Sequence, residues 1–235
     1  LLKAADLSFK KADYKNASNY YEQLLANAET PANILEAKTG LMRAYAFSQE
    51  YAKAIDFAGK VIGSAKVSNE LISESYLTRG KAAAALNNDS LAIGDLIKTS
   101  AMSQSEFGAQ AHYYLTELYH KRNNYPEAEK TIFELVDRVP SYDFWIAKGF
   151  LLLAKNYHAM GDDFQSKETF KSIIEKCEIP DLVKEAQESL NAINAAEEQK
   201  NKVQTPEETE IKFDVPVQNE SEIFEFSILC LHAII

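Results

Sequence analysis

The sequence predicts an all-α protein built as a solenoid of helix-turn-helix repeats. Two observations carry this prediction. Residues that break helices are scarce, with eight glycines and six prolines among 235 residues, and Ala, Leu, Glu and Lys, which favour helices, are abundant. Similar segments also recur along the chain at nearly constant spacing, as they do in repeat architectures.

The recurring segments are centred on small residues, which we call the mark residues. They are Ala17, Ala54, Ala92, Ala128 and Ser166, at spacings of 37, 38, 36 and 38 residues. A short polar turn with an aromatic or acidic residue precedes most of them, and a larger apolar residue follows four positions later in most units. We therefore expect each mark residue to lie on a helix after a turn, where two helix backbones approach closely.

A second helical pattern lies upstream of each turn. Its best copies share a leucine and a tyrosine four positions apart, and they are Leu115 with Tyr119, Leu153 with Tyr157, and Leu41 with Tyr45. Several helix starts are also indicated. Thr30-Pro31 and Pro180-Asp181 are typical of a first helical turn, and Asn124-x-x-Glu127 with Pro126 between them predicts a capping box.

These units resemble the tetratricopeptide repeat (TPR), and the resemblance covers about residues 1–178. The family pattern W-x2-L-G-x2-Y, then A-x3-F, then P is matched best by the fourth unit, which ends at Pro140. The third unit departs most, because Arg79 replaces the expected Leu and Asp89 the expected Tyr. The resemblance implies a right-handed superhelix of about five repeats, with units near 1–31, 35–68, 73–105, 109–141 and 147–178.

A capping helix is expected over residues 179–196. Apolar residues recur there at helical spacing, and the last repeat of a solenoid needs a cover with a polar outer side. We assign Glu185, Glu188 and Asn191 to that outer side.

The remaining residues, 197–235, are expected to form an acidic, largely disordered tail with an apolar end. From Glu197 to Glu225 there are nine acidic residues against three lysines. The apolar end, Ile223 to Ile235, is either a docking segment or a non-native end of a truncated reading frame. The chain does not begin with Met, so we expect a processed protein or a fragment of a longer one.

Composition and motifs exclude several classes of function. The net charge of −10 argues against a nucleic-acid partner, and the longest apolar run is too short to span a membrane. No G-x-S-x-G, H-E-x-x-H or Walker motif occurs, so the sequence predicts neither an enzyme nor a cofactor. His120 and His158 occupy equivalent places in neighbouring units. We expect them to be paired polar groove residues, because a metal site would need further ligands.

In the TPR family the first helix of each repeat lines a concave groove, and this resemblance places the partner-binding positions. They are Arg43, Lys81, Tyr113, Glu117, His120, Lys121, Lys148, Lys155 and His158. The C-terminal half of the groove is then locally basic, which favours an acidic partner. The alternative is a charged face that is merely solvated. The acidic tail is a further candidate to dock into this groove.

The sequence therefore predicts a non-catalytic scaffold that binds a peptide or helical segment of another protein in the groove. Two alternatives remain open: a solute-capture or assembly component of a bacterial cell envelope, and a regulatory fragment of a larger enzyme. The fourth and fifth units resemble TPR proteins of bacterial cell envelopes. That resemblance implies a periplasmic or envelope location, and the cytoplasm is expected otherwise.

Overall fold

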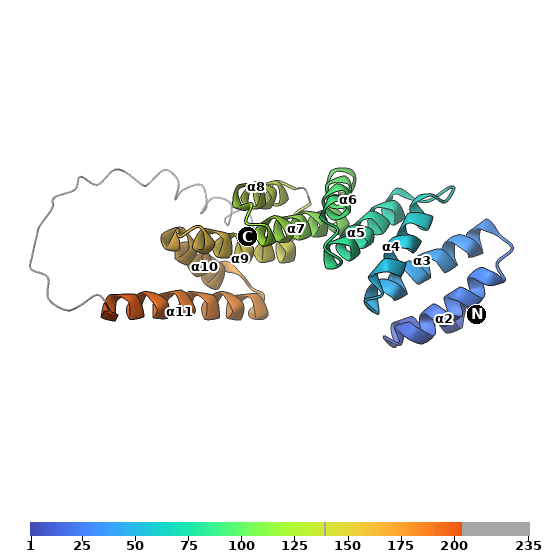
Figure 1. The fold of residues 1–235 in the computed structure, drawn as a ribbon, viewed down its shortest axis with the longest axis horizontal. Coiled ribbons are helices and arrows are strands. Elements are labelled where there is room, and N and C mark those ends of the chain that lie inside the picture. The colour runs from blue at the N-terminus through green and yellow to red at the C-terminus, as the bar shows by residue number, and fades with distance from the viewer. Residues whose placement is uncertain (139, 204–235) are drawn as a thin grey trace, which may run out of the picture. The chain divides into compact units, whose positions relative to one another are not determined.

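The computed structural model describes residues 1–138 and 140–203, and every regular element in them is an α-helix (Figure 1). The helices are α1 (Leu2–Lys10), α2 (Tyr14–Ala26), α3 (Pro31–Phe47), α4 (Tyr51–Ile62), α5 (Asn69–Ala85), α6 (Asp89–Met102), α7 (Glu106–Lys121), α8 (Tyr125–Val136), α9 (Asp143–Ala159), α10 (Asp163–Lys176) and α11 (Pro180–Val203). The predicted all-α fold class is confirmed. Expectations for residues 204–235 lie outside the described residues.

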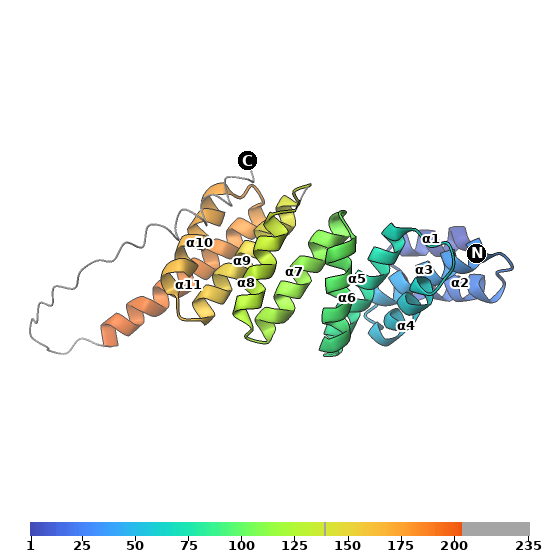
Figure 2. The ribbon, with the colours of Figure 1, turned by 90° about the horizontal axis from the view of Figure 1, so that it is seen from above.

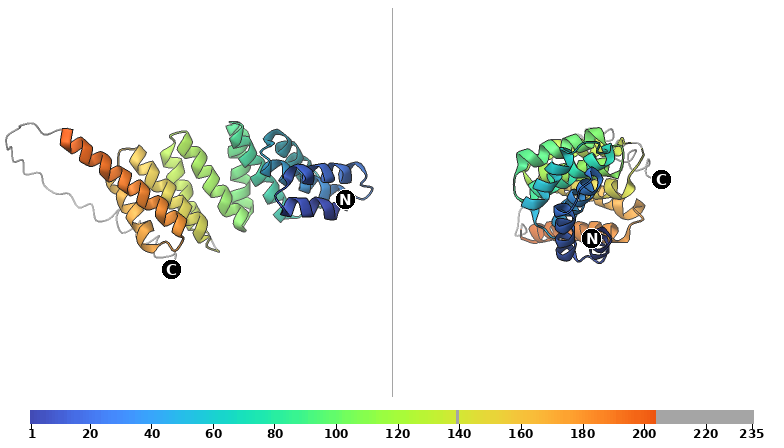
Figure 3. Two further views of the ribbon diagram at one scale, coloured as in Figure 1. Left: turned by 90° about the horizontal axis from the view of Figure 1, so that it is seen from below. Right: turned by 90° about the vertical axis from the view of Figure 1, so that its right-hand side faces the viewer.

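The chain divides into two compact units, Leu1–Leu118 (unit 1) and Tyr119–Ile235 (unit 2), and α7 crosses the boundary. Successive helices pack against one another in antiparallel pairs within each unit (Figure 2). We call α1, α3, α5, α7 and α9 the first helices, because each precedes a turn that leads to a second helix. First helices also contact one another, α1 with α3 and α3 with α5, and α9 contacts α11. Figure 3 shows this stacking of each unit from another side.

The five turns between a first and a second helix share one backbone conformation. One residue in each turn is left-handed, with φ of 58° at Ala12, 62° at Gln49, 57° at Asn87 and Asn123, and 83° at Gly161. The next residue donates its backbone N–H to the carbonyl oxygen five positions earlier, at 2.9 Å in every turn. This bond is that of a Schellman motif, which ends a helix. Each left-handed residue lies five positions before its mark residue, so the turns and marks share one register.

The mark residues pack as expected. All five have an exposed fraction of 0%. In the third repeat, a Cβ atom on Gly80 would lie 3.1 Å from Cγ of Leu96 and 3.4 Å from the carbonyl oxygen of Ala92. The backbones of α5 and α6 therefore approach closely at the mark residue, and only small side chains fit there.

The third repeat departs from the family pattern at Arg79, and the structure shows what replaces the apolar contact. Arg79 on α5 donates from Nε and Nη2 to the two carboxylate oxygens of Asp95 on α6, at 2.6 and 2.9 Å. The Asp95 side chain is only 2% exposed. The hydrogen bonds to Asp95 raise the pKa of Arg79 above its usual value. A two-bond ion pair thus joins the two helices of this repeat.

One predicted helix start is confirmed, and one predicted cap is wrong. The side chains of Thr30 and Ser68 cap α3 and α5, each accepting a backbone N–H at 3.2 Å, and α3 begins at Pro31, as Thr30-Pro31 predicts. The capping box at Asn124 is wrong, because its side chain makes no cap hydrogen bond. The backbone N–H of Asn124 already donates to the preceding helix, so Glu127 cannot use it.

The terminal helix α11 begins at Pro180, as predicted, and its apolar residues are buried. They are Leu182, Ala186, Leu190 and Ile193. The helix continues to Val203, beyond the predicted end at 196. Lys167 on α10 donates to both carboxylate oxygens of Glu197, at 2.8 and 2.9 Å, and this contact supports the extra turns. Glu197, which we assigned to the tail, therefore belongs to the helix. Among the described helices, none is both long and apolar enough to cross a membrane.

Candidate functional site

Three basic residues stand at equivalent positions, eleven residues before a mark residue. They are Arg43 on α3, Lys81 on α5 and Lys155 on α9. Arg43 donates from Nε and Nη2 to the carboxylate of Glu74 on α5, both at 2.6 Å. These hydrogen bonds raise the pKa of Arg43. Lys155 donates to Glu185 on α11 at 2.7 Å. Two members of the charged row therefore make ion pairs between helices, Arg43 from α3 to α5 and Lys155 from α9 to α11.

Lys81 makes a contact of another kind. Its ammonium group lies 4.2 Å from the ring centroid of Tyr114 on α7, which is a cation–π distance. The predicted site residue Tyr113 packs edge-on against Tyr114, with centroids 5.3 Å apart. The predicted positions in unit 1 thus combine a charged side chain with aromatic rings. Glu117, also on α7, is half-buried.

The basic character expected for unit 2 is reduced by Glu185. Glu185 is exposed on the capping helix, as expected, and it also pairs with Lys155. Lys148 lies 5.7 Å from the ring centroid of Phe144 and 5.3 Å from that of Trp145. Lys121 is exposed at the end of α7. Lys155 and Glu185 therefore neutralise one another on this face.

The two histidines bind different partners. Nδ1 of His120 makes a hydrogen bond with Oδ1 of Asn156, a fully buried residue of α9. Nδ1 of His158 lies 2.5 Å from Oδ1 of Asp163 across the turn. In the described part of the chain, no group of three or more His, Cys, Asp or Glu residues could hold a metal ion.

A contact across the turn recurs at two fixed positions, eight and three residues before the mark. It joins Phe9 to Tyr14, with ring centroids 5.3 Å apart, His120 to Tyr125 at 5.9 Å, and His158 to Asp163. The sequence indicated a ring or acid at the second of these positions, but its partner at the first was not predicted. The constant spacing of five residues was the signal that could have found it.

An aromatic cluster in unit 1 was also missed. It consists of Phe9, Tyr14 and Phe47, from α1, α2 and α3. The ring of Phe47 is stacked on Tyr14, with centroids 5.1 Å apart and an angle of 20°, and meets Phe9 edge-on at 5.5 Å. Phe47 nevertheless remains 60% exposed. It lies one helical turn beyond Arg43 on the same helix.

Strongly shifted pKa values belong to tyrosines that join helices. Each donates its hydroxyl to a carboxylate: Tyr21 to Asp6 and Tyr157 to Glu129 at 2.6 Å, and Tyr45 to Glu22. Burial, and then the bond to the carboxylate, raise the pKa of all three hydroxyls well above the usual value. They remain protonated donors at neutral pH and serve the packing of neighbouring helices.

Several solved structures are similar in fold to this chain. The MamA protein is 19% identical, with a TM-score of 0.59 over 88% of this chain and 96% of that chain. BtubC from P. vanneervenii is 16% identical, with a TM-score of 0.59 over 92% of this chain and 85% of that one. YrrB, described as a TPR protein with an unusual peptide-binding site, is 17% identical, with a TM-score of 0.56 over 78% and 88%.

The fold is TPR-like. No protein-family model matches the sequence, and no curated protein matches it. The similarity is therefore one of fold, and it agrees with the resemblance of the repeat pattern to TPR units.

Proposed function

We propose that this chain is a non-catalytic protein-interaction scaffold that binds an extended or helical segment of a partner protein. The binding surface would be the first-helix face, which we define by the nine site positions predicted from the sequence and treat separately in each unit. The TPR-like fold supports this proposal, because such folds usually act by binding and not by catalysis.

The observation that carries the proposal is the row formed by Arg43, Lys81 and Lys155. These residues recur at one register position of the first helices, whereas framework positions on the same helices are buried. The family resemblance assigns the groove to this side. Within unit 1, recurrence at one register position places Arg43 and Lys81 along one face, which suits recognition of an elongated ligand.

The contacts of the row would also favour binding. Arg43 is held by two hydrogen bonds to Glu74, yet its side chain is 44% exposed. A partner carboxylate or backbone carbonyl can approach a guanidinium whose orientation is already set. Ordering such a side chain costs little additional conformational entropy on binding.

The proposed partner is a protein segment with acidic residues. Lysines stand on the first-helix face in both units, and carboxylates would complement them. The pair of Lys155 with Glu185 reduces this attraction in unit 2. Competition by the chain's own acidic tail is part of the proposal, so removal of residues 204–235 should increase partner retention.

The test compares charge reversals on the two kinds of helix. The full chain would be immobilised and exposed to a lysate of its source cells, with retained proteins quantified by mass spectrometry. We expect Lys121→Glu with Lys148→Glu to reduce retention of the specific partner about tenfold. The matched control, Lys130→Glu with Lys171→Glu, changes exposed lysines of second helices and should leave retention unchanged. Equal retention by both variants would contradict the proposal.

A further inference from the structure

Phe47 is unusual among the residues at its register position. Seven residues before each mark stand Lys10, Phe47, Ala85, Lys121 and Ala159. Two of the five are lysines and two are alanines, so the repeat framework does not require a large apolar side chain there. A phenylalanine that is 60% exposed at this position leaves apolar area in water.

The ring of Phe47 is held in place although it is exposed. Its face stacks on Tyr14, and Phe9 meets it edge-on. Because the three rings come from three different helices, the cluster is a preformed surface and not a single mobile side chain. Rigid aromatic rings supply contact area at a low cost in conformational entropy.

The segment that supplies Phe9 and Tyr14 to the aromatic cluster is positively charged. Residues 1–16 contain four lysines against two aspartates, in a protein whose net charge is −10. Both aspartates are already engaged, Asp6 by the hydroxyl of Tyr21 and Asp13 by the backbone and side chain of Asn16. Within 1–138 and 140–203, no carboxylate forms an ion pair with Lys10 or Lys11.

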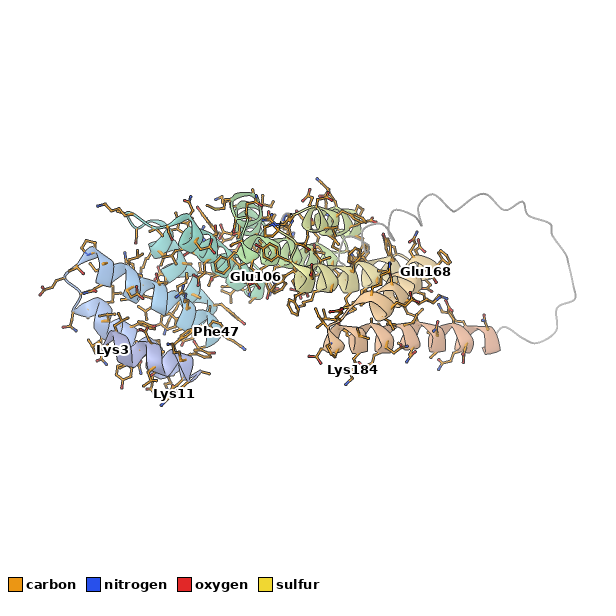
Figure 4. All side chains as sticks on the ribbon, turned by 180° about the vertical axis from the view of Figure 1, so that it is seen from behind. Lys3, Lys11, Phe47, Glu106, Glu168 and Lys184 are labelled. Carbon is orange, nitrogen blue, oxygen red and sulfur yellow. The ribbon has the colours of Figure 1, made fainter. Side chains whose placement is uncertain are left out.

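These lysines lie beside the cluster. Lys10 directly follows Phe9 and stands at the register position that Phe47 occupies in the next repeat, and Lys11 begins the turn that leads to Tyr14. Figure 4 labels Lys11 and Phe47 in this part of unit 1. An apolar ring surface is therefore bordered by cations that have no carboxylate partner among the described residues.

We infer that the aromatic cluster, together with Lys10 and Lys11, is a docking site for a partner segment in which a phenylalanine or leucine is flanked by carboxylates. The inference rests on the proposed function and names the partner chemistry for a site next to the first-helix face, where Phe47 lies one helical turn beyond Arg43. The apolar side chain of the partner packs against Phe47, and the carboxylates pair with the two lysines. Exposed ion pairs contribute little, so most of the affinity comes from the ring contact and the charges select the sequence.

The probe is a nine-residue peptide, acetyl-GSEEFEESG-amide, added to the ¹⁵N-labelled full chain and followed by NMR. We expect chemical-shift changes confined to the end of α1, the start of α2 and the end of α3. A peptide with serine in place of phenylalanine should bind at least fivefold more weakly. A peptide with glutamine in place of glutamate should bind about threefold more weakly and lose its dependence on salt.

Variants of the chain sharpen the test. Phe47→Ala should weaken binding at least fivefold, and Lys10→Glu with Lys11→Glu should weaken it through repulsion. Phe164→Ala is the matched control, since Phe164 on α10 is 55% exposed, and it should leave the affinity unchanged. All altered side chains are exposed, so the variants should fold, and an unchanged thermal melt would verify this.

The inference is overturned if the peptide causes no shifts at millimolar concentration, if the shifts lie elsewhere, or if Phe47→Ala and Phe164→Ala behave alike. Shifts that map to α9 and α11 would overturn it and leave the proposed function standing. Failure of the scaffold proposal would instead appear in the retention experiment, where the first-helix and second-helix variants would be indistinguishable.

Discussion

The third and fifth repeats fill their interiors with different chemistry. Between α5 and α6, Arg79 and Asp95 form an ion pair, and the buried residues of α5 are mostly small. The fifth repeat buries large apolar side chains instead. They include Ile146, Phe150 and Leu153 on α9 and Phe170 and Ile173 on α10.

The backbone of the two repeats is nevertheless the same at the turn and at the mark residue. Asn87 and Gly161 are both left-handed, and Ala92 and Ser166 are both fully buried. The comparison teaches that the turn and the mark residue maintain the register of the repeat. The interior between the two helices can be filled either by apolar side chains or by polar groups that bond to one another. Polar pairs meet that condition only when every buried donor and acceptor is bonded.

The largest expected effect is loss of the ion pair in the third repeat. Asp95→Ala would leave the partly buried guanidinium of Arg79 without its counter-charge and should destabilise the protein by about 3 kcal/mol, measured by urea unfolding. The double variant Arg79→Leu with Asp95→Leu should recover most of this loss. Asp56→Ala is the control, because the pair of Asp56 with Lys60 is exposed, and its effect should stay below about 0.5 kcal/mol. Equal effects of the two single variants would contradict this view of the third repeat.

The mark residue of the third repeat should be nearly as sensitive. Ala92→Leu would overpack the contact between α5 and α6 and should cost about 2 kcal/mol in a urea titration. Ala101→Leu places the same side chain on an exposed position of α6 and should have little effect. A wild-type unfolding midpoint for Ala92→Leu would mean that the repeat register is misplaced.

The mark residue of the fifth repeat should respond in the opposite direction. Oγ of Ser166 is buried without a hydrogen-bond partner, so Ser166→Ala should stabilise the protein by about 1 kcal/mol in thermal unfolding. Ser73 is the control in the third repeat, because its hydroxyl donates to the carbonyl oxygen of Asn69 at 2.9 Å. Ser73→Ala should therefore give no such stabilisation. Stabilisation by Ser73→Ala but not by Ser166→Ala would contradict the prediction.

Substitutions at the turn residues of the third and fifth repeats should change the free energy of unfolding by up to about 1 kcal/mol, with opposite signs. Gly161 has φ of 83° and no atom within 4 Å of an added Cβ, so Gly161→Ala should cost about 1 kcal/mol through backbone strain alone. Asn87→Gly should stabilise the third turn slightly, by about 0.5 kcal/mol. Gly94→Ala, inside α6 and equally free of contacts, should instead stabilise through helix propensity. Differential scanning calorimetry would separate these signs.

The smallest effect at neutral pH concerns Tyr157 of the fifth repeat, where the third repeat has Ala83. The pKa of Tyr157 in the folded protein is raised above the value of about 10 expected for the unfolded chain. Its contribution is therefore complete below about pH 10 and is lost as the pH rises further. Tyr157→Phe should cost about 0.5 kcal/mol of stability at pH 7. Between about pH 9 and about pH 11, the variant should lose less stability than the wild-type protein does. Parallel pH profiles for the two proteins would refute this role.

Much of the fold could be predicted because packing constrains it periodically. The five mark residues, the helix pairs and the start of α11 follow from small and apolar residues at helical spacing. The end of α11 could not be predicted, since the contact of Lys167 with Glu197 joins residues thirty positions apart. The pairing of Glu185 with Lys155 could not be predicted for a related reason, since the two residues are also thirty positions apart.

The candidate site was predictable only in part. Arg43, Lys81 and Lys155 were selected because they recur with the repeat, and their role in binding stays a prediction. The exposed aromatic cluster was missed because its surface depends on rings from three helices, and no single helix carries the pattern. Exposed positions are freer of packing constraints, so the fold does not dictate their residues.

The central claim is that the third repeat keeps the same turn and register as the others despite its different interior. The most direct test is measurement of φ-sensitive NMR couplings at the five turn residues of the full chain, with Asn87 as the decisive position. We predict a positive φ at Asn87, as at Ala12, Gln49, Asn123 and Gly161. A negative φ at Asn87, with positive values at the other four, would contradict the claim.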